Sequence, residues 1–158
     1  MGMNMKKVSL DVWIQSIGMS SVVAGLIFVG LEMRQSQQIA LAAQQQARAA
    51  LNVSHLNSFT ESGIDHQFVV WEQNFNYELS KEEIAFRNQY HVSWHLYEND
   101  YYQYRQGLMD ESTWSAKKVG IQNIYNMCRG RVIYAHRVRV FAEEFRTIVE
   151  SLPDECAE

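Results

Sequence analysis

The chain has 158 residues, a formal net charge of -4 at pH 7 and a hydrophobic content of 47%. This length leaves room for one ordinary domain beside an anchor and excludes a second enzymatic domain. The acidic balance argues against a dedicated nucleic-acid-binding protein, which carries a basic surface, so no nucleic-acid partner is expected.

An uncharged apolar run over residues 12–31 predicts a transmembrane helix, assigned to residues 12–33 behind a short lead of residues 1–11. At about 1.5 Å per residue, such a helix covers the ~30 Å hydrocarbon core of a bilayer. A secretory signal also begins with positive charge, here Lys6 and Lys7. Its apolar core is shorter, however, and ends at a small-residue cleavage pattern that this run lacks.

Small residues recur along the predicted span on two neighbouring helix faces. They are Ser16, Gly18, Ser20, Ser21, Ala24 and Gly25. Small residues let two helices approach closely in lipid, where no hydrophobic effect drives helices together. We interpret them as a homo-oligomer contact; the alternative is the ordinary abundance of Gly and Ser in membrane spans.

No Gly or Pro occurs between Leu31 and Ser62, so the membrane helix is expected to continue as one long helix as far as Gly63. Along its outer half, residues recur at alternating spacings of three and four, the pattern of a helical seam. These residues are Ile39, Ala42, Gln46, Ala49, Val53 and Leu56. The seam either lines the domain's own bundle or packs against the same helix of another subunit.

About four further helices are predicted after Gly63, and no strand signals appear, so the fold class is all-α. The bundle is assigned to residues 34–152 and an acidic tail to residues 153–158. Ser80 and Glu83 form a capping-box pattern, and Asp110 is a second cap. The expected helices cover residues 64–76, 81–106, 111–129 and 132–152.

The two cysteines, Cys128 and Cys156, are too few for a disulfide framework and lack metal-binding spacing. Because Cys156 lies in a tail expected to be frayed, no bridge between them is predicted. Free cysteines favour a reducing compartment. The positive charges on the two sides of the span are nearly balanced, with Lys6 and Lys7 before it and Arg34 after it. The positive-inside rule therefore favours a cytoplasmic position of the domain only marginally.

Charge is unevenly distributed over the bundle. Most of the charged residues at positions 61–111 are acidic, whereas residues 112–142 contain no Asp or Glu. The two parts either face each other or are solvated. Alternatively the basic part lies on anionic lipid head groups, where each cation contributes about 1 kcal/mol. The candidate head-group contacts are Arg129, Arg131, Arg137 and Arg139.

His91, His95 and Glu98 share one helical face through spacings of four and three, as metal ligation from a helix requires. The alternative is that the histidines pack and Glu98 forms an ion pair. Next to them, a polar and aromatic group is either a ligand lining or part of the core. It consists of Asn99, Tyr101, Tyr102 and Gln103. No nucleophile elbow, P-loop or dinucleotide motif occurs, so neither catalytic residues nor a cofactor are predicted.

Three segments resemble a family of uncharacterised bacterial membrane-anchored proteins: residues 26–35 (LIFVGLEMRQ), residues 98–111 (ENDYYQYRQGLMDE) with Trp114, and residues 141–150 (FAEEFRTIVE). The resemblance implies one N-terminal span in the bacterial inner membrane, a helical domain and no assigned activity. One departure is Ala142, Glu143 and Glu144 before Phe145, where a Pro-Glu-Phe pattern is common, so the last helix is expected to start differently.

The sequence therefore predicts a single-span helical interaction or assembly protein that self-associates. Its expected partners are the lipid bilayer, further copies of the chain and an unidentified membrane protein. The alternative function is a membrane-tethered sensor domain that binds a small molecule or a metal.

Overall fold

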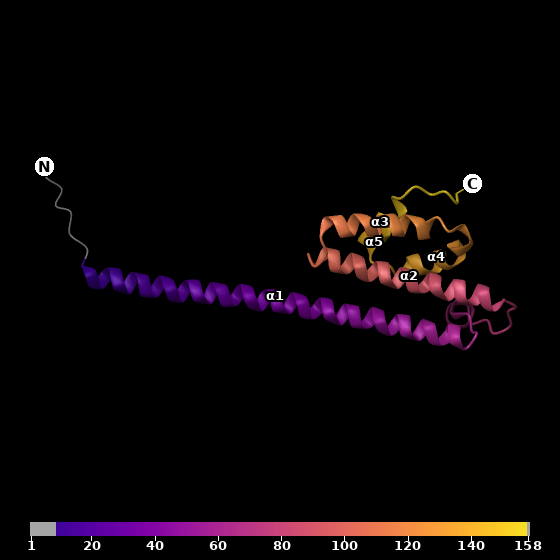
Figure 1. Cartoon of the computed structure of the whole chain (residues 1–158), viewed down its shortest axis with the longest axis horizontal. Coiled ribbons are helices and arrows are strands. Elements are labelled where there is room, and N and C mark those ends of the chain that lie inside the picture. Colours follow the sequence, from indigo (N-terminus) through magenta and orange to yellow (C-terminus); the bar gives the residue numbers. More distant parts are fainter. Residues whose placement is uncertain (1–8, 158) are drawn as a thin grey trace. The chain divides into compact units, whose positions relative to one another are not determined.

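The computed structural model describes residues 9–157, and this part of the chain is all-α, as predicted (Figure 1). Helix α1 spans Leu10–Glu61 without interruption. The chain divides into two compact units, residues 1–40 and residues 41–158. Most of the predicted lead lies outside the described residues.

In the first unit, α1 leaves its apolar side chains exposed. An 18-residue window of the helix has a mean hydropathy of 1.8, and none of it is buried. By length and composition this helix is able to cross a membrane, although a signal sequence near an N-terminus passes the same test. The predicted continuation beyond Leu31 is confirmed, because the helix ends only two residues before Gly63, whose φ of +67° suits a glycine.

In the second unit, α1 buries Ala42, Ala49 and Leu56, one residue in every seven. Helix α2, Lys81–Arg105, lies beside this half of α1 (Figure 1). Gln103 of α2 donates a hydrogen bond from its Nε2 to the carbonyl oxygen of Ala42 over 3.1 Å. At these three buried positions the seam therefore lines the domain's own bundle.

Both predicted helix starts are confirmed. The Ser80 hydroxyl accepts a hydrogen bond from the Glu83 amide, and the Glu83 carboxylate accepts one from the Ser80 amide, which completes the capping box before α2. Asp110 accepts from the amide of Thr113 at the start of α3, Glu111–Tyr125.

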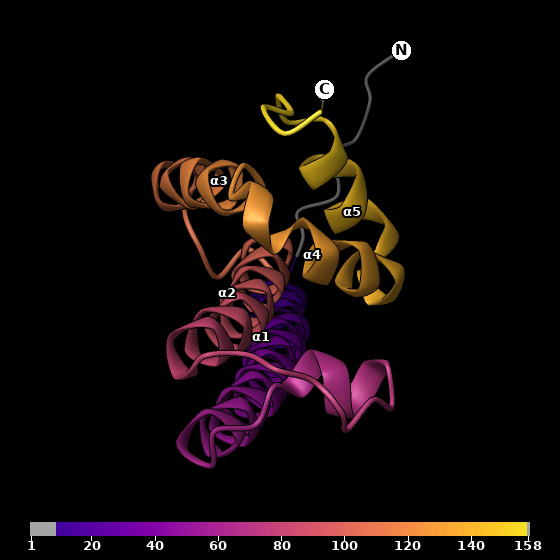
Figure 2. The ribbon, with the colours of Figure 1, turned by 90° about the vertical axis from the view of Figure 1, so that its right-hand side faces the viewer.

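The aromatic core lies on the side of α2 that faces α3, α4 and α5 (Figure 2). Trp94 is fully buried, and its ring centroid lies 5.3 Å from those of both Tyr134 and Phe141. Gly130 allows the chain to pass over the ring of Tyr90, because a Cβ at this position would lie 2.3 Å from the ring atom Cε2. Helix α2 is thus the central element of the domain.

The predicted continuous helix over residues 132–152 is wrong. The chain forms α4, Arg131–Arg137, a 3-10 turn Val138–Val140, and α5, Glu143–Glu150, with extended backbone at Phe141. Side chains four apart in an α-helix differ in direction by about 40°, so sixteen residues accumulate about 160°. A continuous helix could not bury both Ile133 and Val149, which are fully buried here. The break at Phe141 reorients the segment that follows it, so that Val149 is buried as well as Ile133.

The first predicted helix after Gly63 shrinks to a single π-helical turn, Gln67–Trp71. A 3-10 turn, Cys128–Gly130, precedes α4.

The prediction of free cysteines and a frayed tail is also wrong. A disulfide joins Cys128 to Cys156, with 5.4 Å between their Cα atoms. Arg131 forms an ion pair with Asp154, and Asn126 donates from its side chain to the carbonyl oxygen of Pro153 over 3.2 Å. These contacts hold the tail against the domain.

Candidate functional site

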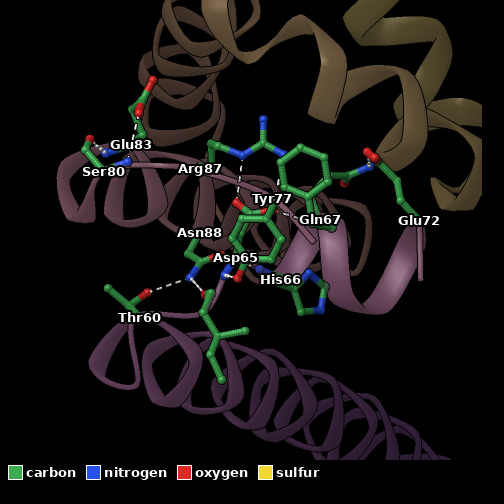
Figure 3. Close-up of polar contacts among 12 residues, drawn as sticks. Thr60, Asp65, His66, Gln67, Glu72, Tyr77, Ser80, Glu83, Arg87 and Asn88 are labelled. Carbon is green, nitrogen blue, oxygen red and sulfur yellow. Dashed lines mark hydrogen bonds and ion pairs between the residues drawn. The ribbon is translucent and has the colours of Figure 1, made fainter. Parts of the chain in front are cut away.

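A buried carboxylate fixes the loop between α1 and α2 (Figure 3). Asp65 is fully buried and forms a two-point ion pair with Arg87, with distances of 2.7 and 3.2 Å. It also accepts a 2.7 Å hydrogen bond from the Phe68 amide, and its own amide donates to the Tyr77 hydroxyl. Because its charge and hydrogen bonds are satisfied inside the fold, this pair holds the loop in place.

A buried amide completes the attachment of this loop. The side chain of Asn88 accepts from the His66 amide and donates to the Thr60 hydroxyl and to the carbonyl oxygen of Ile64, over 2.8 to 3.1 Å (Figure 3). It connects α2 to the end of α1 and to the loop. Neither Asp65 nor Asn88 was predicted from the sequence, because an isolated polar residue belongs to no recognisable spacing pattern.

Histidine rings follow this network into the domain. The ring of His66 lies between His55 and His91, with centroid distances of 6.2 and 4.8 Å. His91 is fully buried, and neither of its ring nitrogens has a hydrogen-bond partner among the residues that the structure describes. Burial lowers the pKa of His66 to about 4 and that of His91 to about 2. Both rings are therefore neutral near pH 7.

The cation of this region is Arg137, which is only 4% exposed. Its guanidinium forms an ion pair with Glu98, and its nitrogens lie 3.2 and 3.4 Å from the two ring nitrogens of His95. Burial, with the repulsion of Arg137, lowers the pKa of His95 to about 3. Burial raises the pKa of Glu98 to about 7, and Arg137 opposes that rise. These three side chains thus combine a fixed cation, a neutral imidazole and a carboxyl group whose pKa lies near 7.

The predicted set of His91, His95 and Glu98 does share one side of α2, but it does not form a cluster around one point. His91 is enclosed in the core, whereas His95 and Glu98 contact a guanidinium. In the part of the chain that the structure describes, no group of three or more His, Cys, Asp or Glu side chains is arranged to hold a metal ion. The geometry gives the metal hypothesis no support.

A hollow of about 310 Å³ opens beside Arg137. Residues of α1, α2, α4 and the Val138–Val140 turn line it. Those used below are Gln45, Arg48, Asn52, His95, Glu98 and Arg137. A second hollow of about 230 Å³ shares Gln45 and Glu98 with the first. Its other lining residues include Tyr101, Tyr102 and Phe145. Two of the four predicted lining residues, Tyr101 and Tyr102, therefore border an open space.

The other two predicted lining residues have internal partners. Gln103 donates to α1 and lies 3.5 Å from the Asn99 side-chain oxygen. Neither residue borders either hollow. Gln103 thus joins α2 to α1, and Asn99 lies against Gln103, which favours the alternative that these two residues belong to the interior of the domain.

The four arginines proposed for lipid head groups differ in exposure and in their contacts. Arg137 is buried, so it is unavailable to a head group. Arg131 lies 3.8 Å above the ring of Tyr125 and Arg129 lies 4.4 Å above that of Phe86. Arg139 is exposed. The basic segment is thus used mainly for packing and for the ion pair with the tail.

The small residues proposed as an oligomer contact are exposed on α1. A shallow groove along the helix is lined by Trp13, Ser16, Ile17, Ser20, Ser21 and Ala24. Space is open where a Cβ would be added to Gly18 or Gly25. This face is therefore free for another helix within the described structure.

No protein-family model, curated protein or solved structure matches this chain. The comparisons therefore identify no family, and the family resemblance remains a prediction. The structure shows that the described part of the chain is all-helical and has one long apolar helix near its N-terminus.

Proposed function

We propose that this chain is a single-span protein of the bacterial inner membrane whose helical domain serves as an interaction and assembly module. The observation that carries the proposal is the exposure of the apolar half of α1, where Ile14, Leu26 and Phe28 are each 60% exposed or more. An uncovered apolar surface of this size is unstable in water, whereas lipid covers it at no such cost.

The disulfide supports a position of the domain outside the cytoplasm, opposite to the side that the sequence favoured. Disulfides persist in oxidising compartments such as the bacterial periplasm and are rare in the cytosol. In this orientation Lys6 and Lys7 lie on the cytoplasmic side, as the positive-inside rule prefers. Arg34 then lies on the outer side, at a position of α1 that is exposed in the described structure.

The topology is tested with two reporter fusions after residue 158. Alkaline phosphatase is active only outside the cytoplasm, and green fluorescent protein made through the general secretion route fluoresces only inside. We expect phosphatase activity without fluorescence, and retention of the fusion in the membrane fraction after carbonate washing. Fluorescence without phosphatase activity would place the domain in the cytoplasm, and release by carbonate would exclude the span.

Self-association is proposed through the groove at Ser16, Ser20 and Ala24, since small residues allow close helix packing in lipid. The test is sedimentation of the full chain in detergent, with Ser20→Leu as the variant. Leu26→Phe is the control, because position 26 lies about 120° around the helix from Ser20. We expect an oligomer that Ser20→Leu dissociates and Leu26→Phe preserves. A monomer at all concentrations would remove this part of the proposal.

The hollow beside Arg137 favours a second candidate function, a membrane-tethered sensor of a small molecule. Its walls come from both α1 and α2, so an occupant would contact the long helix and the domain together. A sensor requires that occupancy changes the association of the chain. Sedimentation with and without a bound ligand measures this change.

A further inference from the structure

We propose that the hollow beside Arg48 and Arg137 binds a small organic monocarboxylate, whose apolar body occupies the adjoining aromatic hollow. This inference rests on the second candidate function and names its ligand class.

The charge of the hollow selects an anion. Arg48 and Arg137 are cations and Glu98 is the one carboxylate in the lining, so even with Glu98 fully ionised one positive charge remains. Burial raises the pKa of Glu98 to about 7, so partial protonation of Glu98 at pH 7 increases this positive charge. His95 adds none near pH 7, because burial and Arg137 lower its pKa. A monocarboxylate balances this remaining charge through a charge-assisted hydrogen bond to the exposed Arg48.

The two arginines have different tasks. Arg137 is held by Glu98 and His95, and its Nε has no hydrogen-bond partner among residues 9–157. Arg48 is exposed at the rim and forms no ion pair within the described chain. We therefore assign the direct ion pair with the carboxylate to Arg48, while Arg137 supplies a fixed positive field. The side-chain amide of Asn52, one helical turn from Arg48, is placed to donate a hydrogen bond.

The second hollow gives the ligand its apolar body. Gln45 and Glu98 line both hollows, and Tyr101, Tyr102 and Phe145 form the aromatic part of the second wall. Arg105 also lines the second hollow, but its charge is paired with Glu144. Aromatic side chains bind flat apolar groups well, and ligand sites combine such walls with a few polar groups. With volumes of about 310 and 230 Å³, the two hollows suit a compact molecule of this kind.

The test is calorimetric titration of the full-length protein in nanodiscs at pH 7, with three probes of matched parts. Benzoate carries a charge and a ring, acetate only the charge and benzyl alcohol only the ring. We expect benzoate to bind at least about tenfold more tightly than either other probe. Equal affinities, no benzoate binding up to about 10 mM, or tighter binding of inorganic phosphate would each overturn the ligand class.

Two variants locate the site. Arg48→Gln removes the direct ion pair, and Asn52→Asp adds a negative charge at the rim; each is expected to weaken benzoate binding about tenfold or more. The controls are Arg139→Gln and Asn57→Asp, which make the same changes at exposed positions outside the hollow. Equal losses in the controls, or wild-type affinity in both variants, would refute the site. Benzoate binding that leaves sedimentation unchanged would keep the site and reject the sensor function.

Discussion

Replacement of His91 by phenylalanine is expected to make the domain less sensitive to acid. His91 is fully buried and both of its ring nitrogens lack partners in the described part of the chain. Burial lowers its pKa to about 2, from 6.5 in an unfolded chain. The unfolded chain therefore binds a proton below pH 6.5 that the folded chain refuses. Stability is complete above that pH and decreases as the pH falls.

The size of this effect follows from the two pKa values. Below pH 6.5 the imidazole favours the unfolded chain by about 1.4 kcal/mol for each pH unit, which gives about 2 kcal/mol at pH 5. At pH 7 the loss of two unpartnered polar atoms stabilises the variant, and the slightly larger ring costs a similar amount. We therefore expect stabilities within about 1 kcal/mol of each other at pH 7 and a clear advantage of the variant at pH 5.

The assay is equilibrium urea unfolding of the full chain in detergent, followed by tryptophan fluorescence and by circular dichroism at pH 7 and pH 5. Coincident transitions establish two-state behaviour. His66 and His95 remain in both proteins, so the change in the difference between wild type and His91→Phe isolates His91. A wild-type protein that loses no more stability between the two pH values than the variant would refute the reasoning.

Three further changes test the packing. Asp65→Asn leaves the Arg87 guanidinium, which is only 13% exposed, without its counter-charge and should cost about 3 kcal/mol in urea unfolding. A loss below about 1 kcal/mol would show that the pair is dispensable. Gly130→Ala places a Cβ 2.3 Å from the buried ring of Tyr90 and should cost about 1–3 kcal/mol, whereas Gly30→Ala meets open space and serves as the control. Cys128→Ser opens a loop with a sequence separation of 28 and should cost about 3.5 kcal/mol, as should reduction of the wild type; an unfolding midpoint indifferent to reductant would contradict the disulfide.

Local signals in the sequence predicted much of the fold. The absence of Gly and Pro over residues 32–62 indicated a continuous helix, and the structure has one. Ser80 with Glu83 and Asp110 marked helix starts that the structure confirms. Each of these features acts through the backbone of its own segment, within about one helical turn. No knowledge of the rest of the chain is needed to read it.

Features that depend on distant residues were not predictable in this way. The break at Phe141 allows both halves of the C-terminal segment to be buried in the domain. In the sequence, only the residues at Ala142 indicated that this helix starts differently. The disulfide requires that the tail returns to the end of α3, which residues 126 and 131 bring about through long-range contacts. Arg48 is identified as a candidate ligand-binding residue only by the hollow that it lines, because a single arginine on a helix forms no spacing pattern in the sequence.

Helix α2 carries two different lines of inward-facing side chains. Aromatic residues at positions 90, 94, 97, 101 and 104 lie in or against the apolar core with α3, α4 and α5. A second line at positions 88, 91, 95 and 98 is polar, and Asn88 bonds to the end of α1. Both lines alternate spacings of four and three, so periodicity alone could not separate them. The layer beside α1 thus depends on hydrogen bonds, neutral histidines and one ion pair. Polar contacts of this kind respond to protons and to anions in a way that the aromatic layer does not, because their energy depends on charge. This is why we place both the acid sensitivity and the ligand site between α1 and α2.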